Sequence, residues 1–411
     1  MTFFDDKIYK VSPAMTGHMV KVDPYNHKER FLEWKQTAEN GIDGLTHLNE
    51  IILKKYLSDM ENGLNVAFLM KKGPRSYVRL YTLRIRLTFM MKHFQKRFNI
   101  EEVTKVDEEQ LHTLFRELRT GVIRKQNGGI YESAKDYARD FKAFWHWHQK
   151  VNKKKGIEVL DITSDLDTTG DKPKWVYLTE EEVQKLTEKA KFNYKVLIWF
   201  LFDSGIRAPT ELMNIRVADF QNDFKELNIR QEVSKTFGRR IKLMLCSDLL
   251  RQYVKEKKLG AYDYIFPICP PVVNRYLKRL SRRVLGDAES PARQRYCELT
   301  MYDFRHCSSC YWLPRYKSES ALKYRFGWKK SDKIHYYSEL LGMKDTINEE
   351  DMLMDVTRTE IEKDLVATKK QNQILEDKQR TTDIQLSQIM ELVRELEEKF
   401  NIKFGGIYQH N

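Results

Sequence analysis

The segment LTMYDFRHCSSCYWL (residues 299–313) is followed after a short interval by YRFGWKKSDKIHYYSEL (residues 324–340). Arg305 lies in the first segment and Tyr337 in the second. Tyrosine, arginine, cysteine and tryptophan recur at helical spacing in the first segment, which predicts one helix beginning just after Thr300. An arginine can hold a phosphate through two parallel hydrogen bonds, and a tyrosine hydroxyl can attack it. These residue types are common in any basic protein, so the surrounding motifs have to decide their meaning.

Two further motifs lie upstream. The stretch DSGIRAPTELMNIRVADF (203–220) contributes Arg207 just after a glycine. In ELNIRQEVSKTFGRRIKLMLC (226–246), apolar residues alternate with polar ones on both sides of Gly238. This change of period predicts a β-hairpin with Lys235 at its turn. A single hairpin lysine is ordinarily a solvated turn residue.

In their order and spacing, these motifs resemble the tyrosine recombinase (integrase) family. The catalytic domain of that family carries an arginine followed by a glutamate, a hairpin lysine, an HxxRH-type box, a GH or GW dipeptide, and a tyrosine. The matching positions in this sequence are Arg207 with Glu211, Lys235, the box of Tyr302, Arg305 and His306, the dipeptide Gly327–Trp328, and Tyr337. The resemblance covers residues 203 to 340.

The sequence departs from the family pattern at two places. The box normally opens with His or Lys, and here it opens with Tyr302. The tyrosine position is doubled, so Tyr336 is an alternative to Tyr337 as the nucleophile. The family spacing, counted from Trp328, favours Tyr337. The first departure concerns proton transfer and leaves the expected reaction class unchanged.

The resemblance implies a site-specific DNA recombinase that needs no ATP, metal or cofactor. Arg207 and Arg305 would neutralise the charge that grows on the scissile phosphate. Tyr337 would attack the phosphorus, form a covalent 3′-phosphotyrosine link and release a 5′-hydroxyl, which Lys235 would protonate. The hydroxyl of a second strand would then reverse the step. The remaining family positions are expected to pack around the phosphate or orient the other groups: Glu211, Tyr302, His306 and Trp328.

Composition agrees with a polyanionic partner. The 411-residue chain has a formal net charge of +13 and 12% aromatic residues, and it lacks an apolar run long enough to span a membrane. This balance favours double-stranded DNA as the partner and does not favour a membrane. The start, MTFFDDKIYKV, does not have the form of a signal peptide. We therefore expect a cytoplasmic, DNA-associated protein encoded by a prokaryote, virus, plasmid or other mobile element.

The cysteines do not form a disulfide framework. Cys307 and Cys310 have the spacing of half a zinc site, but a second pair with matching spacing is absent from the sequence. Two buried thiols on one helix are therefore the preferred interpretation.

The chain is expected to be mainly α-helical with a small β-hairpin, an α+β protein of the two-domain recombinase type with an added tail. The helical block resembles the family's core-binding domain in layout only, and a bundle with an ordinary charged surface is the alternative. Basic side chains that could track DNA phosphates are Arg79, Arg84 and Arg86 in this block and Arg275, Lys278, Arg279, Arg282 and Arg283 further on. The expected segments are an arm (1–27), a helical core-binding domain (28–151), a linker (152–175), the catalytic domain (176–344) and a helical tail (345–411).

A heptad pattern runs through the tail. Its apolar or small polar positions alternate at steps of three and four, as a coiled-coil seam requires. Asn372 falls at an a position, where it lowers stability but can fix the register. A coiled coil or partner-docking helix is expected, and a long single helix is the alternative. The seam positions are Ile361, Leu365, Thr368, Asn372, Leu375, Gln379, Thr382, Leu386, Ile389, Val393, Leu396 and Phe400.

Three functions remain to be distinguished. A recombinase would assemble as a homo-oligomer on DNA, with four copies joining two duplexes. A type IB topoisomerase uses similar chemistry and normally acts alone. A DNA-binding accessory protein could keep the fold without cleaving DNA. Covalent trapping on nicked DNA separates the accessory protein from both enzymes.

Overall fold

The computed structural model describes residues 21–67, 72–170, 173–316, 318–341 and 360–400. Helices dominate, with one small antiparallel sheet, so the expected α+β class is confirmed. The chain divides into two compact units, Met1–Leu341 and Gly342–Asn411. Most of the expected arm (1–20) and both ends of the expected tail lie outside the described residues.

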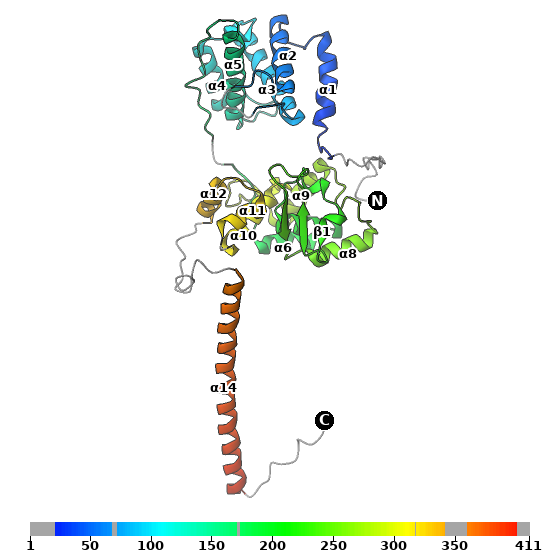
Figure 1. The fold of residues 1–411 in the computed structure, drawn as a ribbon, viewed down its shortest axis with the longest axis vertical. Coiled ribbons are helices and arrows are strands. Elements are labelled where there is room, and N and C mark those ends of the chain that lie inside the picture. The colour runs from blue at the N-terminus through cyan, green and yellow to red at the C-terminus, as the bar shows by residue number, and fades with distance from the viewer. Residues whose placement is uncertain (1–20, 68–71, 171–172, 317, 342–359, 401–411) are drawn as a thin grey trace. The chain divides into compact units, whose positions relative to one another are not determined.

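Two separate hydrophobic cores lie within the first unit. The first belongs to a helical bundle, shown in Figure 1, in which the apolar stripe of α3 packs against its neighbours. Leu83, Leu87 and Phe94 on this stripe are buried, as the helical period predicts. The helices are α1 (His27–Thr37), α2 (His47–Asn62), α3 (Tyr77–Phe98), α4 (Glu108–Thr120) and α5 (Ala134–Lys153).

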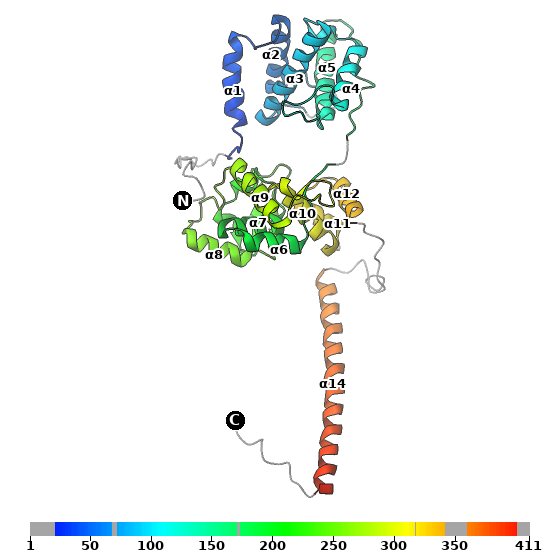
Figure 2. The same cartoon turned by 180° about the vertical axis from the view of Figure 1, so that it is seen from behind.

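The second core is built around α7, which Figure 2 shows among α6, α8, α9 and α10. The sequence of α7 is apolar on nearly every side, as a helix that is buried all round requires. Its neighbour α6 begins with a capping box between Thr179 and Glu182. The helices are α6 (Glu180–Lys189), α7 (Phe192–Ser204), α8 (Ser247–Lys257), α9 (Pro270–Leu285), α10 (Asp303–Trp312), α11 (Glu319–Phe326) and α12 (Asp332–Leu340).

The sheet of this second domain has the strand order β1 (Phe220–Gln221), β2 (Glu226–Ile229) and β3 (Arg239–Lys242), all antiparallel. Strands β2 and β3 form the expected hairpin, with Leu227 opposite Ile241. Both of these side chains face the core. The loop between the two strands contains Lys235, which confirms the expected placement of this lysine.

The segment expected to be a linker (152–175) is largely exposed where the structure describes it, but it is anchored at a few points. Helix α5 extends to Lys153, and Ile162 and Leu166 belong to the core of the helical bundle. At the other end, Trp175 is only 2% exposed and belongs to the second hydrophobic core. The polar composition of this segment concealed these apolar anchors, because a few isolated side chains give no periodic pattern.

The second unit contains the long helix α14 (Glu360–Phe400). Every side chain of α14 that the structure describes is exposed, including the seam residues Leu386 and Ile389. Among the described residues, the structure has no helix that is both long enough and apolar enough to cross a membrane.

Candidate active site

Arg207 lies just beyond the end of α7. The backbone turns at Gly205, whose φ of 57° lies in the left-handed region that glycine adopts most easily. Nη1 of Arg207 donates to Oε1 of Glu211 at 2.7 Å, and Nη2 donates to the carbonyl oxygen of Gly327 at 3.0 Å. The arginine is therefore held between the end of α7 and the GW dipeptide, with 14% of its side chain exposed.

Glu211 is fully buried and pairs with a second arginine, Arg239 of strand β3, at 2.8 Å. Burial alone would raise the pKa of Glu211. Arg239 and Arg207 outweigh this effect and lower the pKa to about 2, so the carboxylate stays charged. Glu211 thus orients Arg207, as the family resemblance implied, and also fixes Arg239.

Arg305 approaches the same region from α10 and is also buried. Its Nη1 and Nη2 donate to the carbonyl oxygens of Gly205 and Phe326, each at 2.5 Å. Burial, and then repulsion from Arg207, lowers the pKa of Arg305 to about 10, so it remains protonated at neutral pH. These hydrogen bonds go to uncharged carbonyls, which leaves the positive charge available to an anion. Helix α10 begins at Asp303, slightly later than the start expected after Thr300.

Lys235 is exposed in the hairpin loop, and it has no hydrogen bond or ion pair to any residue that the structure describes. Its two neighbours anchor the loop to the arginine cluster. The Ser234 hydroxyl donates to Glu211 at 3.4 Å, and the Thr236 hydroxyl donates to the Gly327 carbonyl at 2.9 Å. The lysine is therefore held beside the cluster with its ammonium group free.

His306 and Tyr337 meet directly. Nδ1 of His306 lies 2.6 Å from the hydroxyl oxygen of Tyr337, whose side chain on α12 is 3% exposed. Burial lowers the pKa of His306 to about 3, with smaller contributions from Lys333 and Arg305, so the imidazole is neutral at pH 7. Burial also raises the pKa of Tyr337 well above its usual range. The tyrosine is thus protonated and hydrogen-bonded to a neutral histidine.

Aromatic rings enclose this pair. Trp328 stacks on Tyr337 with ring centroids 5.8 Å apart and on Phe326 at 4.8 Å. Tyr302, the residue that departs from the family box, is 50% exposed and meets His306 edge-on at 5.3 Å. The structure therefore brings the predicted residues of the box, the GW dipeptide and the tyrosine position into one site.

Tyr336 has a different environment from Tyr337. Its hydroxyl accepts a hydrogen bond from Nε1 of Trp175 at 2.7 Å and donates to the carbonyl oxygen of Pro173 at 3.1 Å. Tyr336 is thus engaged with residues 173–175, whereas Tyr337 is the tyrosine bonded to His306.

Both thiols of the Cys307–Cys310 pair are buried, as expected for two cysteines on one helix. Sγ of Cys307 donates to the carbonyl oxygen of Val176 at 3.4 Å. Burial raises the pKa of Cys310 to about 12, which makes it a poor source of thiolate ligands. Within the described part of the chain, no group of three metal-ligating side chains occurs.

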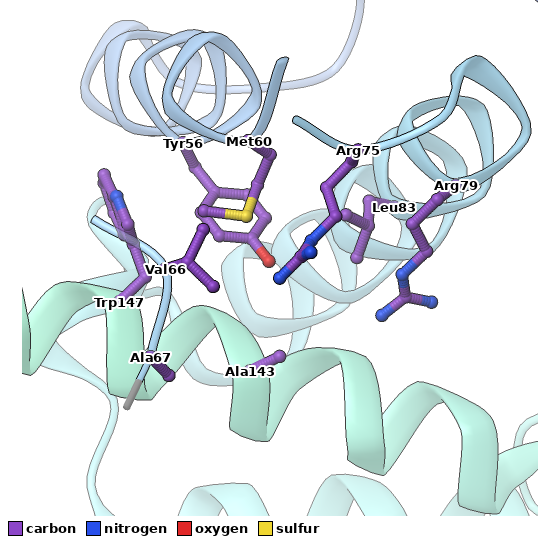
Figure 3. Close-up of a pocket in the computed structure, with 9 residues that line it drawn as sticks. All are labelled: Tyr56, Met60, Val66, Ala67, Arg75, Arg79, Leu83, Ala143 and Trp147. Atoms are coloured by element: carbon purple, nitrogen blue, oxygen red, sulfur yellow. The ribbon is translucent and has the colours of Figure 1, made fainter. Parts of the chain in front are cut away.

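The basic side chains expected on α3 are engaged within the bundle. Arg79 and Arg86 both pair with the buried Asp140, at 2.5 and 2.8 Å. Figure 3 shows Arg79 next to the apolar side chain of Leu83. Arg84 lies over the ring of Trp34, with its guanidinium carbon 5.2 Å from the ring centroid. The sequence could not reveal these partners, because Asp140 and Trp34 lie on other helices.

The basic residues expected on α9 fall into two groups. Lys278 pairs with Glu298, Arg282 pairs with Asp287 at 3.0 Å, and Arg283 donates to the Lys189 carbonyl at 3.1 Å. Arg275 and Arg279 are exposed and have no ion pair or hydrogen bond with the rest of the described chain. They are one helical turn apart and so share a face of α9.

Two residues of the site are absent from the sequence-based prediction. Arg239 could have been found by extending the alternation of β3 one step back from Ile241, since the strand buries every second side chain. Trp175 precedes the apolar residues Val176 and Tyr177, a short run that marks the start of the second domain. Its contacts with α10 and α12 carried no local signal.

No protein-family model and no curated protein match the sequence. Among solved structures, a lambda integrase dimer bound to a COC′ core site has a TM-score of 0.52 and 12% identity, covering 81% of this chain and 85% of that chain. A Tn1549 transposon integrase in complex with a circular intermediate DNA has a TM-score of 0.51 and 12% identity, covering 74% of this chain and 96% of that chain. The chain therefore has the fold of the tyrosine recombinases.

Proposed function

We propose that this chain is a tyrosine-type, site-specific DNA recombinase that cleaves and rejoins DNA through a 3′-phosphotyrosine. The observation that carries the proposal is the convergence of Arg207, Arg305, His306 and Tyr337 from different elements. Two guanidinium groups near a tyrosine hydroxyl are suited to binding a phosphodiester beside a nucleophile. The DNA-bound lambda and Tn1549 integrases, which share the fold, support DNA as the substrate.

The cleavage step uses the hydrogen bond between Tyr337 and His306. As the tyrosine oxygen attacks phosphorus, its proton passes to Nδ1 of the neutral His306; the step requires the tautomer that carries the ring proton on Nε2. A bond forms from the tyrosine oxygen to phosphorus, and the bond from phosphorus to the 5′-oxygen breaks. Arg207 and Arg305 stabilise the charge that develops on the non-bridging oxygens.

The departing 5′-oxygen needs a proton. Lys235 is the proposed donor, because its ammonium group is free and its loop is anchored to Glu211 and Gly327 by the residues on either side. Attack by a 5′-hydroxyl from a second strand reverses the step, regenerating the tyrosine and the phosphodiester. The phosphotyrosine conserves the bond energy, so the residues described here complete the cycle without an energy-rich cosubstrate.

Trapping on nicked substrates tests the proposal. A duplex nicked just downstream of the cleavage site loses its short 5′-hydroxyl fragment, so the protein stays covalently attached. We expect the wild-type chain to form this complex with fragmented DNA from its own source, and Tyr337→Phe to abolish it while retaining DNA affinity. A complex that survives in Tyr337→Phe but vanishes in Tyr336→Phe would move the nucleophile to Tyr336. The absence of any complex with the wild-type chain would favour the inactive accessory protein.

The proposed DNA-binding surface includes Arg275 and Arg279 of α9, which are exposed and have no ion pair or hydrogen bond with any residue that the structure describes. Arg79 and Arg86 are weaker candidates, because the buried Asp140 already neutralises them. The helical bundle would contribute its remaining surface, which includes Arg84.

The tail is proposed to serve assembly of a homo-oligomer on DNA. Leu375, Leu386 and Leu396 lie along one heptad seam of α14, and all three are exposed. A helix of this length with exposed apolar side chains along a seam is stabilised by a second helix more than by its own propensity. The polar a position of Asn372 favours a parallel, in-register pair of identical helices. Recombination between two sites needs such assembly, whereas a topoisomerase acting alone does not.

A further inference from the structure

Trp175 occupies the junction between the segment that precedes the catalytic domain and the candidate active site. Its backbone N–H donates to the carbonyl oxygen of Ala292 at 3.2 Å, and its own carbonyl accepts from the Ser290 hydroxyl at 3.2 Å. The side chain is 2% exposed. A buried tryptophan whose backbone is fixed by hydrogen bonds gives the side chains that pack on its ring a rigid surface.

The ring of Trp175 touches both members of the nucleophile pair. It stacks on His306, with centroids 4.8 Å apart and an angle of 25° between the planes. It also meets Tyr337 edge-on, with centroids 6.2 Å apart. The indole therefore sets the plane of the imidazole whose Nδ1 bonds to the tyrosine hydroxyl.

The indole N–H fixes the nucleophile helix through the neighbouring tyrosine. Nε1 of Trp175 donates to the Tyr336 hydroxyl at 2.7 Å, and that hydroxyl donates in turn to the Pro173 carbonyl at 3.1 Å. Both hydrogen bonds tie α12 to residues 173–175. Helix α12 has only nine residues, no side-chain cap at its N-terminus, and Tyr337 as its fully buried residue. The partly buried Ile334 and Leu340 also pack α12 against the core. The hydrogen-bonded link through Tyr336 adds directional contacts to this packing.

We propose that Trp175 and Tyr336 form a latch that positions the nucleophile Tyr337 against His306. Trp175 is a positioning residue that acts through both His306 and α12, and Tyr336 is the latch partner and not a second nucleophile. The inference rests on the proposed cleavage function, since the pair it positions is the reacting pair. It also explains the doubled tyrosine: adjacent residues of a helix point in different directions, so one reaches the histidine and the other the latch.

The same segment also orders the start of α10. The backbone N–H of Val176 donates to Oδ1 of Asp303 at 3.2 Å, and Oδ2 of Asp303 accepts from Thr300. Arg305 and His306 follow Asp303 on that helix. Residues 173–176 therefore contact both the helix that carries Arg305 and His306 and the helix that carries the nucleophile. A misplacement of these elements by a fraction of an ångström to 1 Å is enough to slow a reaction by orders of magnitude.

The test compares Trp175→Phe, Tyr336→Phe and the double variant. Trp175→Phe keeps an aromatic platform but loses the N–H donor, and Tyr336→Phe removes the acceptor from the other side. We expect each single change to slow covalent-complex formation by about 3- to 10-fold, the worth of one hydrogen bond. Both changes remove the bond between Trp175 and Tyr336, and Tyr336→Phe also removes the bond to Pro173, so the double variant should be no slower than the slower single variant. DNA affinity should stay within about twofold of the wild type, since these variants leave the phosphate-binding arginines in place.

Trp175→Ala removes the platform as well as the donor and should slow cleavage by about 100-fold or more. Trp199→Phe is the matched control, because Trp199 is a partly buried tryptophan of the same core whose ring packs on Phe202 of α7. It should cleave at the wild-type rate. Multiplicative losses in the double variant, or unchanged rates in both single variants, would overturn the latch.

A second readout does not depend on cleavage. Amide hydrogen exchange should become faster in α12 (residues 332–340) in both single variants, with α7 unchanged. Normal exchange in α12 would reject the latch whatever the enzyme does. If the wild-type chain formed no covalent complex while exchange in α12 still rose in the variants, the proposed recombinase function would fail and the latch would stand as a structural contact.

Discussion

Nδ1 of His306 lies 2.6 Å from the hydroxyl oxygen of Tyr337, although 31 positions separate the two residues in the sequence. The histidine stays neutral because burial lowers its pKa to about 3. The hydroxyl stays protonated because burial raises the pKa of Tyr337. The pair is therefore in the protonation state from which attack begins. The reaction also requires the scissile phosphate and the arginines that hold it.

The pKa of His306 makes stability depend on pH. In the unfolded chain, this histidine titrates near its ordinary value of about 6.5, whereas the folded protein keeps it neutral down to about pH 3. Between these values the unfolded state binds one more proton, so stability falls as the pH falls. At pH 5.5 the loss from this residue should be about 1.4 kcal/mol. Thermal melts at pH 7.5 and 5.5 should show a larger drop for the wild type than for His306→Gln. Equal drops in melting temperature for the wild type and His306→Gln would mean that His306 is protonated in the folded protein at pH 5.5.

Arg305 is expected to contribute directly to cleavage. Arg305→Gln removes a positive charge and the planar donor fork, so covalent-complex formation should fall by about 100-fold or more, the scale for losing one preorganised donor. Long-duplex affinity should change little, because many other cations contribute. The control is Arg240→Gln, which changes an exposed arginine of β3 whose ion pair with Glu226 is long, at 3.9 Å. Normal cleavage by Arg305→Gln in a correctly folded protein would remove Arg305 from the site.

Glu211 is expected to be essential for stability. Glu211→Gln would leave the buried Arg239 without its carboxylate partner, and breaking a buried pair in this way costs about 3–5 kcal/mol. Glu226→Gln is the matched control, because its partner Arg240 is exposed and a surface pair contributes at most about 1 kcal/mol. Chemical denaturation monitored by tryptophan fluorescence measures the free energy of unfolding of both variants. A small loss for Glu211→Gln would show that water or a rearranged partner compensates Arg239.

Affinity for DNA should depend steeply on salt. The logarithm of the binding constant should fall linearly with the logarithm of salt concentration, because bound cations displace counterions from the phosphates. Replacing both Arg275 and Arg279 by Ala should reduce the slope by about two. Arg251→Ala on α8 is the control, since Asp223 and Asp248 already neutralise that arginine. An unchanged slope in the double variant would place DNA on another face of the domain.

The tail should affect recombination between two sites more than cleavage of one. Leu386→Asp with Ile389→Asp places charges in the proposed seam, so joining of two sites should fall at least tenfold while single-site trapping persists. The control is Ile384→Asp, since Ile384 is equally exposed on the same helix but lies outside the seam. Equal loss in the control would indicate that the changes act through solubility or helix stability. Loss of single-site trapping would show that the tail supports the catalytic domain itself.

Local patterns predicted much of this protein. The helical spacing after Thr300 identified α10, and the change to period two identified the hairpin with Lys235. Such features depend on neighbours in sequence, so a linear pattern can reveal them. The expected site residues Arg207, Arg305, His306 and Tyr337 came from the order of motifs. Their roles in catalysis remain predictions.

The tertiary structure decided what these side chains contact. Whether Arg79 is free for DNA depends on Asp140 on another helix, and the burial of Arg239 depends on Glu211, 28 positions away. The distinct environments of Tyr336 and Tyr337 are set by Trp175 and His306, which come from separate segments. Hydrogen bonds and ion pairs act over a few ångströms in space, irrespective of distance along the chain. The sequence by itself therefore determined which residues could take part, and only the fold determined which of them meet.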